Sequence, residues 1–194
     1  MKIEIKILNK EFYKRSNEQN LSYPPKDIYD LPSYATLGSA AMDLICTEDV
    51  IIYPGETTAI PTGIAIWIGS STYNKRDEIS FNNNIAALII PRSGLGTKGL
   101  VLANTIGLID EDYQGELIVQ AWNRNESNTS EEPFSLKGDI VFETCEVEHN
   151  CIELKAGDRF AQLMFVPIIK AQWNVVEEFS SQTERNNGGF GSTD

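Results

Sequence analysis

The sequence has a single histidine, His149, and three cysteines in 194 residues. A Ser-His-Asp hydrolase would have to be built on that one histidine, so we expect any general base to be a carboxylate. An odd number of cysteines without an export signal indicates reduced thiols. The spacing of Cys145, His149 and Cys151 is compatible with a metal site, but two strand residues flanking a turn explain it more simply.

Positive charge is also scarce. The 16 Lys and Arg residues are outnumbered by 28 Asp and Glu residues, which gives a net charge of −12. This balance opposes binding to a nucleic-acid backbone, although a few local cations and a metal ion could still hold a free triphosphate. No apolar run approaches the roughly 20 residues needed to cross a bilayer, and the N-terminus alternates like a strand. We expect a soluble, cytoplasmic protein that binds neither nucleic acid nor membrane.

Short apolar runs between turn signals predict an all-β fold, a sandwich or barrel in one domain. Turns are marked by Pro-Gly, Pro-Thr-Gly and two Gly-Asp pairs. One short helix is expected over 93–100, although its three glycines weaken it. The expected strands are 3–8, 50–52, 57–60, 64–68, 86–90, 117–121, 140–142 and 163–169.

Three segments are too polar to bury much surface. Residues 69–84 and 123–135 are rich in Ser, Asn and charge, and we interpret them as polar insertions. The tail 180–194 is polar and Gly-rich, so alone it should be mobile. A single arginine and a single phenylalanine in that tail are unusual enough to need a reason.

The segment PRSGLGTKG, residues 91–99, follows an apolar strand and enters the expected helix. Backbone N–H groups at such a turn bind anions, while Arg92 and the Ser93 hydroxyl add donors. Taken alone, an ordinary Gly-rich turn is the simpler interpretation.

The segment IDEDYQG, residues 109–115, lies between an apolar stretch and an alternating strand, and predicts a hairpin. A carboxylate there could deprotonate water, and Tyr113 could stack on a sugar or base. Asp and Gly are equally what a plain turn requires.

Two further segments leave the choice open. In residues 156–162, Asp158 is typical of a turn, whereas Arg159 and Gln162 could contact a ligand or satisfy backbone carbonyls. In SAAMDL, residues 39–44, Asp43 is more often a turn or cap residue than a metal ligand.

Taken in order, SAAMDL, PRSGLGTKG, GLIDEDYQGEL, GDRFAQL and ERNNGGFGST resemble the five motifs of the deoxyuridine triphosphatase (dUTPase) family, over residues 39 to 193. The resemblance implies an all-β, jelly-roll-like subunit with one short helix, in a homotrimer whose active sites are shared between chains. It implies Mg²⁺-assisted hydrolysis of dUTP to dUMP and pyrophosphate, which limits uracil in DNA. Residues 1–179 would form the β-domain and 180–194 a lid.

The resemblance also implies roles for individual residues. Asp110 would activate the water that attacks the α-phosphorus, and Asp43 would hold Mg²⁺ through water, with the substrate phosphates. The positions implied for phosphate oxygens are Arg92, Ser93, Gly94 and Gln162. Those implied for uracil and deoxyribose are Asn104, Ile109 and the backbone of 108–113, with Tyr113 against the sugar. Those implied in the tail are Arg185, Ser192 and Thr193 on the β- and γ-phosphates, Gly191 beside them, and Phe190 stacked over uracil.

Two departures from the family pattern matter. Ala41 and Asn186 stand where the motifs usually have glycine. Ala41 would be strained if the position needs a positive φ, whereas Asn tolerates the left-handed region.

Two alternatives remain. A dCTP deaminase shares the fold, but it normally carries a glutamate in the hairpin region, where IDEDYQG has the dUTPase form. A nucleotide-responsive binding protein could use the insertions to contact a partner.

Overall fold

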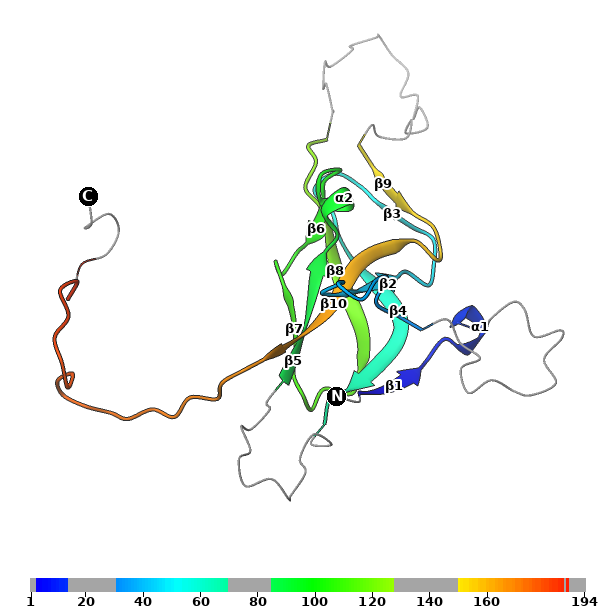
Figure 1. Cartoon of the computed structure of the whole chain (residues 1–194). Helices are drawn as coiled ribbons and strands as arrows, with labels where there is room; N and C mark the ends of the chain where they lie inside the picture. The colour runs from blue at the N-terminus through cyan, green and yellow to red at the C-terminus, as the bar shows by residue number, and fades with distance from the viewer. Residues whose placement is uncertain (1–2, 14–30, 70–84, 128–149, 187, 189–194) are drawn as a thin grey trace, which may run out of the picture.

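The computed structural model describes residues 3–13, 31–69, 85–127, 150–186 and 188. Within these ranges the chain is mostly β, as expected, and its strands form three antiparallel sheets (Figure 1). The first sheet has the order β1 (Glu4–Ile7), β4 (Thr57–Trp67), β8 (Glu116–Asn123) and β6 (Leu100–Leu102). The second has the order β2 (Met42–Ile45), β10 (Arg159–Pro167), β5 (Ile85–Pro91) and β7 (Gly107–Ile109). The third pairs β3 (Val50–Ile52) with β9 (Ile152–Leu154).

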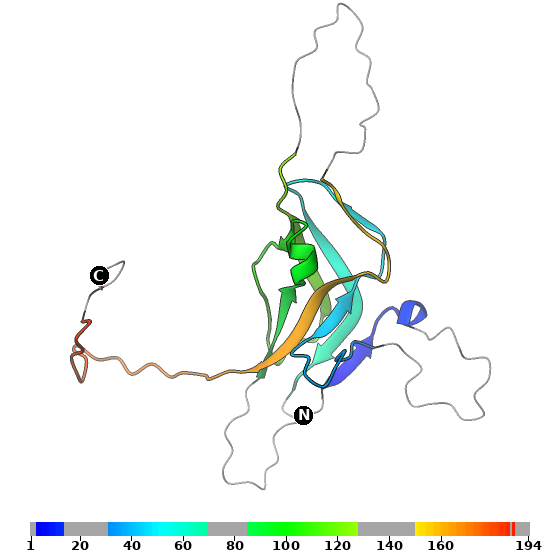
Figure 2. The ribbon, with the colours of Figure 1, turned by 45° about the horizontal axis from the view of Figure 1, so that its top comes forward.

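The hydrophobic core takes side chains from all three sheets. Figure 2 shows how the strands of these sheets are arranged. Strand β8 shows why: Leu117, Val119 and Ala121 are buried, and the residues between them are exposed. This two-residue period places one face of the strand inward. Strand β5 is buried more continuously, with Ala87 and Ile89 in the core. Each fully buried Val, Leu or Ile side chain in this core stabilises the fold by about 1.5–3 kcal/mol.

The turn predicted at 61–63 is wrong. Residues 57–67 form one long strand, β4, whose register against β8 shifts between Pro61 and Ala65. Proline cannot donate to the ladder, and Gly63 has a φ of +69°, so the segment bulges without ending the strand.

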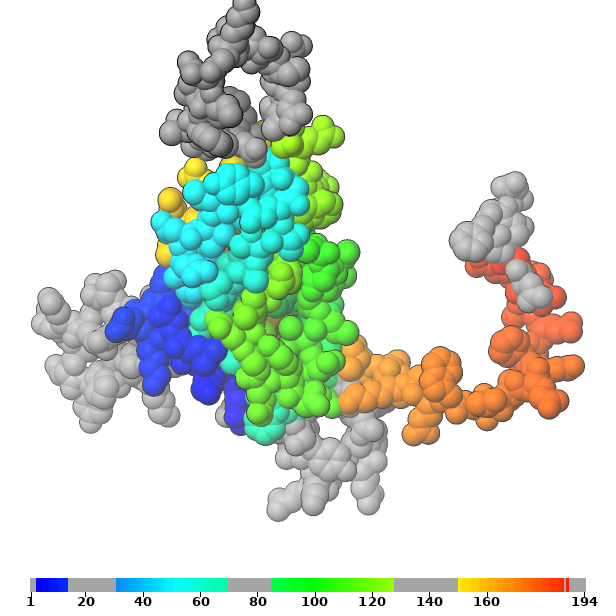
Figure 3. Space-filling view, turned by 180° about the vertical axis from the view of Figure 1, so that it is seen from behind, coloured from blue at the N-terminus to red at the C-terminus, as the bar shows by residue number. Residues whose placement is uncertain are grey.

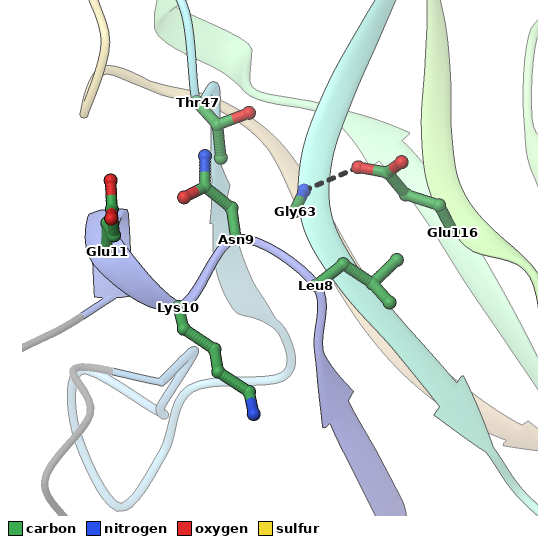
Figure 4. Close-up of a pocket in the computed structure, with 7 residues that line it drawn as sticks. All are labelled: Leu8, Asn9, Lys10, Glu11, Thr47, Gly63 and Glu116. Atoms are coloured by element: carbon green, nitrogen blue, oxygen red, sulfur yellow. Dashed lines mark hydrogen bonds between the residues drawn. The ribbon is translucent and has the colours of Figure 1, made fainter.

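Groups from elsewhere in the chain stabilise this bulge, among them the Glu116 carboxylate drawn in Figure 4. The Gly63 N–H donates to Oε1 of Glu116 at 2.8 Å, and the buried Tyr13 hydroxyl donates to the Thr62 carbonyl at 2.6 Å. Burial, reinforced by the Glu116 charge, raises the pKa of Tyr13 to about 12. Tyr13 belongs to α1 (Lys10–Tyr13), a short helix that the sequence did not predict.

Several predicted boundaries also move. The helix expected over 93–100 is a single turn, α2 (Ser93–Gly96), because the chain enters β6 at Leu100. Strand β10 begins at Arg159, four residues before the predicted start at 163. Strands β2, β6, β7 and β9 were not among the predicted strands. The strand expected at 140–142, and most of both polar insertions, lie outside the described residues.

Beyond β10 the chain leaves the body of the protein. Residues 168–186, the C-terminal arm, contain no helix or strand and extend away from the sheets (Figures 1 and 3). Four of their large apolar side chains are almost fully exposed, Ile169 at 96%, Trp173 at 95%, Val175 at 94% and Phe179 at 90%, whereas Val176 is 50% exposed. Among the described residues no helix could cross a membrane.

Candidate active site

Asp43 is the centre of a charged cluster between two neighbouring strands. Its Oδ1 is 3.0 Å from Nε of Arg92 and its Oδ2 is 3.5 Å from Nη1 of Arg159. Gln162 Nε2 also donates to Oδ1, at 3.4 Å. The register places Gln162 opposite Asp43 on β2 and opposite Ile90 on β5, which explains why distant segments meet here. Two guanidinium groups around one carboxylate leave a local excess of positive charge, suited to an anion.

This arrangement shows which contacts Asp43, Arg159 and Gln162 make within the chain. Asp43 lies inside β2, so the prediction that it is a turn or cap residue is wrong. Arg159 directs its guanidinium to Asp43, and its carbonyl accepts a hydrogen bond from Arg92 Nη1 at 2.9 Å. Gln162 contacts the Asp43 side chain, which neither alternative included, and its contact with a ligand stays a prediction.

A hollow of about 260 Å³ opens beside the cluster. It is lined by Asp43 and Gln162 together with small residues that precede β2, and by side chains of β5 and β10: Ser33, Ala35, Ser39, Ala40, Ala41, Ile90 and Met164. The small side chains leave space beside the charged groups. The structure thus gathers Asp43, Arg92 and Gln162, three of the predicted site residues, at one place.

The turn that we predict to bind phosphate, residues 93–99, follows Arg92 directly and is called the phosphate turn below. Because α2 is one turn long, we assign it no dipole effect, and its anion-binding capacity rests on individual donors. The N–H groups of Ser93 and Gly94 have no hydrogen-bond partner among the described residues, and both residues are exposed. Free N–H groups beside a guanidinium are a suitable site for phosphate oxygens.

The segment 107–115 is not the paired hairpin that the sequence predicted. Strand β7 pairs with β5 in one sheet, whereas β8 pairs with β4 and β6 in another. Residues 110–115 therefore cross between two sheets. As a result β7 is an edge strand, and no described strand pairs with its other side. An unpaired strand edge presents N–H and C=O groups that can bond a ligand.

The side chains predicted around this edge are accessible. Asn104 lies in the exposed turn before β7, and Ile109 is half-buried at the end of β7. Tyr113 is 43% exposed, and its hydroxyl donates to the Glu116 carbonyl at 3.0 Å. Asp110 is exposed just beyond β7.

Asp110 and the phosphate turn lie at opposite ends of β5. The register pairs Ile109 with Ala87, so Asp110 comes level with Ala86. Arg92 is six positions after Ala86, which corresponds to roughly 20 Å along a strand. A base and the phosphorus that its water attacks must lie within a few ångströms. One chain therefore does not bring Asp110 to its own phosphate turn.

Contacts that the sequence did not reveal hold the Asp110 segment. Glu111 accepts a hydrogen bond at its carbonyl from the Gly69 N–H at 3.0 Å, and its carboxylate is 2.5 Å from Nζ of Lys170. Gly69 is the first residue of one insertion, and Lys170 lies near the start of the C-terminal arm. No motif signals these contacts, because they depend on how three distant chain segments meet.

The tail is described in part. Arg185 is exposed, and its Nε donates to the Gly188 carbonyl at 2.9 Å. Asn186 has a φ of +43°, in the left-handed region that asparagine tolerates. Ala41 is not among the described residues with positive φ, so its replacement of glycine causes no strain there. Phe190, Gly191, Ser192 and Thr193 lie outside the described residues.

A second hollow in the described part of the chain lacks the predicted site residues. A larger hollow, about 530 Å³, lies beside the β4 bulge and includes no predicted site residue (Figure 4). Its lining residues are Leu8, Asn9, Lys10, Glu11, Thr47, Gly63 and Glu116. Cys145 and His149, of the conceivable metal trio, lie outside the described residues. Within the described ranges no group of three His, Cys, Asp or Glu side chains could hold a metal ion.

Comparison with known proteins assigns these features to one family. The dUTPase family model matches residues 28–132 and 135–194. A deoxyuridine 5'-triphosphate nucleotidohydrolase of Haemophilus influenzae (strain PittEE) is 42% identical over 193 residues, 98% of this chain and 95% of that protein. The enzyme of the same name from Histophilus somni (strain 2336) is 45% identical over 166 residues, 84% of this chain and 86% of that protein.

Solved structures show the same relationship. The dUTPase of Staphylococcus bacteriophage 80alpha, in complex with dUPNHPP, has a TM-score of 0.68 and 25% identity, covering 100% of this chain and 98% of that one. A mutant dUTPase of phage phi11 of S. aureus, described with a structural Mg(II) ion, has a TM-score of 0.65 and 25% identity, covering 93% and 100%.

Proposed function

This chain belongs to the dUTPase family and is a dUTP diphosphatase, and from that premise we propose that it hydrolyses dUTP in sites assembled from more than one copy of the chain. The supporting observation is the separation along β5 of Asp110 from the Asp43 cluster and phosphate turn. A second chain that presents its Asp110 end to this phosphate turn would complete the site.

We assign the phosphate groups to the positive end of this arrangement. Arg92 and the N–H groups of Ser93 and Gly94 would bind phosphate oxygens, and Gln162 would contribute its amide from β10. Asp43 keeps the Arg92 guanidinium in place through its 3.0 Å contact. Such fixed donors stabilise negative charge without reorganising during the reaction.

Asp110 is assigned as the general base. Its carboxylate would take a proton from water, whose oxygen forms a bond to the α-phosphorus while the bond to the pyrophosphate oxygen breaks. The exposed position of Asp110 beyond β7 leaves it free to act on a nucleotide held by a neighbouring chain.

The site offers Mg²⁺ one carboxylate, that of Asp43. This cation commonly uses one or two carboxylates together with substrate phosphates and waters. Asp43 supplies one carboxylate, but its oxygens already contact Arg92 and Arg159. We therefore assign it to a metal-bound water and not to direct coordination. When bound, Mg²⁺ would offset triphosphate charge and hold its oxygens in a reactive geometry.

The free edge of β7 is assigned to uracil recognition. Its unpaired peptide groups, with Asn104 and Ile109 nearby, can pair with the polar edge of the base. A base bonded closely to this edge would leave no space for the methyl group of thymine. Tyr113, against the sugar face, would exclude a 2′-hydroxyl by the same steric means.

We propose a homotrimer, in a cytoplasmic protein, as the assembly that completes the site. The C-terminal arm supports an association between copies, because four large apolar side chains on it are at least 90% exposed. A second copy could bury these side chains. Residues 1–179 would form the β-domain, and 180–194 a lid. Arg185, Ser192 and Thr193 would grip the β- and γ-phosphates, next to Gly191, and Phe190 would cover uracil.

Substrate specificity tests these assignments. Pyrophosphate release should be fast from dUTP and at least about a hundredfold slower from dTTP, UTP and dCTP, because each analogue meets a clash or an unpaired group. Comparable release from dTTP would refute the role of the β7 edge, and comparable release from UTP that of Tyr113. Ammonia released from dCTP would establish the deaminase alternative instead.

A further inference from the structure

The segment that follows β8 donates hydrogen bonds to carbonyl groups at the C-terminal end of the phosphate turn. Arg124 Nη2 donates to the Gly96 carbonyl at 3.2 Å, and the Arg124 N–H donates to the Gly99 carbonyl at 3.0 Å. Asn125 Nδ2 donates to the Lys98 carbonyl at 2.9 Å. Carbonyls at the end of a short helix need partners from outside it. Two consecutive residues therefore satisfy three carbonyls behind the turn.

Steric fit at Gly99 supports the same relationship. Gly99 has a φ of +102°, and a Cβ at this position would lie only 2.3 Å from Oδ1 of Asn125. The asparagine side chain thus packs directly on the glycine backbone. A side chain at position 99 would displace Asn125 and strain the backbone.

Asn125 is itself anchored to the core. Its N–H donates to Oδ1 of Asn123 at 3.1 Å, and Asn123 is completely buried. Asn123 Nδ2 donates to the carbonyls of Ile52 and Asn150, each at 2.9 Å. The hydrogen bonds therefore run without interruption from β3, through the two asparagines, to the back of the phosphate turn.

We propose that Asn125 and Arg124 are positioning residues for phosphate binding. They fix the far end of a turn with glycines at 94, 96 and 99, which is conformationally free by itself. By doing so they determine where the unpaired N–H groups of Ser93 and Gly94 point. This inference rests on the proposed role of the turn in phosphate binding, and it gives a function to residues outside the five motifs.

Replacement of the Asn125 amide tests the proposal. Asn125→Asp keeps the size but replaces the donor with an oxygen that repels the Lys98 carbonyl. We expect about tenfold weaker binding of the non-hydrolysable imido analogue of dUTP, the cost of one lost and one repulsive contact. Deoxyuridine, which has no phosphate, should bind with unchanged affinity. Arg124→Gln removes the second side-chain contact from an exposed position and should show the same selectivity at about threefold.

Two control variants make the outcome decisive. Glu126→Gln changes the next residue, whose exposed side chain makes no described hydrogen bond or ion pair, and should bind both ligands normally. Arg92→Gln should weaken binding of the triphosphate analogue strongly. If Arg92→Gln does so while Asn125→Asp and Arg124→Gln do not, the positioning role is refuted and phosphate binding at the turn stands. If Arg92→Gln has no effect, both proposals fail. Equal losses for the analogue and deoxyuridine would show a general structural defect and would also refute positioning.

Discussion

The two ends of β5 are built from different chemistry. At the end near Pro91, Arg92 and Arg159 surround Asp43, and free N–H groups follow in the phosphate turn. At the end near Ile85, Asp110 is exposed beside an open strand edge. The first region suits an anion, and the second suits a base and a water molecule. Neither alone contains what hydrolysis of a nucleoside triphosphate requires, and in the proposed assembly each region takes its counterpart from another chain.

Replacement of the proposed general base should give the largest effect. Asp110→Asn should bind the imido analogue of dUTP normally but lose at least about a hundredfold in kcat, because the water loses its proton acceptor. Steady-state kinetics and a binding titration on the same preparation separate the two effects. Near-normal turnover would show that Asp110 is not the general base, and the two ends of β5 would then not differ in the proposed way.

Removal of the tail tests whether a third region is needed. A chain without residues 181–194 should stay folded, because none of the residues that the structure describes in this segment, 181–186 and 188, belongs to the core. Its turnover should fall by roughly tenfold to a hundredfold, since the nucleotide is less well oriented. Circular dichroism checks the fold and pyrophosphate release the activity. An unimpaired truncated enzyme would mean that the tail is not a lid.

The apolar side chains of the C-terminal arm allow a test of assembly. Trp173→Ser should weaken association of the copies by about tenfold or more, because burial of a large apolar side chain contributes roughly 1.5–3 kcal/mol. Analytical ultracentrifugation over a range of concentrations measures this shift. Gln172→Ser, a polar neighbour on the same exposed arm, is the matched control. Equal behaviour of both variants would place the arm outside the interface.

The ion pair near Asp110 should matter least. Lys170 and Glu111 are 56% and 36% exposed, and surface pairs contribute about 0–1 kcal/mol. Lys170→Ala should therefore change kcat by no more than about threefold. The 3.0 Å hydrogen bond from the Gly69 N–H still holds the backbone of the segment. A loss like that of Asp110→Asn would show that the ion pair positions the base.

Sequence patterns predicted what local chemistry determines. The alternation of β8 and the limits of β3 were predictable because burial on one face leaves a two-residue period. The motifs pointed to Asp43, Arg92 and Gln162, which the structure brings together. The pairing partners of the strands were harder to predict from the sequence. Strand β7 pairs with β5 and not with β8, because the packing of two sheets determines this pairing.

The residues missed by sequence analysis act through distant contacts. Arg124 and Asn125 belong to a segment that composition marks as a polar insertion, yet both bond the back of the phosphate turn. Arg159 had two equally plausible local roles until the register placed it near Asp43. The β4 bulge resembled a turn because proline and glycine serve both structures.

Subunit mixing tests the central claim most directly. Asp110→Asn and Arg92→Gln should each be nearly inactive alone. If a site takes Asp110 from one chain and Arg92 from another, unfolding and refolding an equal mixture should restore about a quarter of wild-type activity, because one site in four then combines two intact residues. Activity no higher than that of the separate variants, in mixed oligomers verified by mass spectrometry of tagged chains, would contradict shared sites.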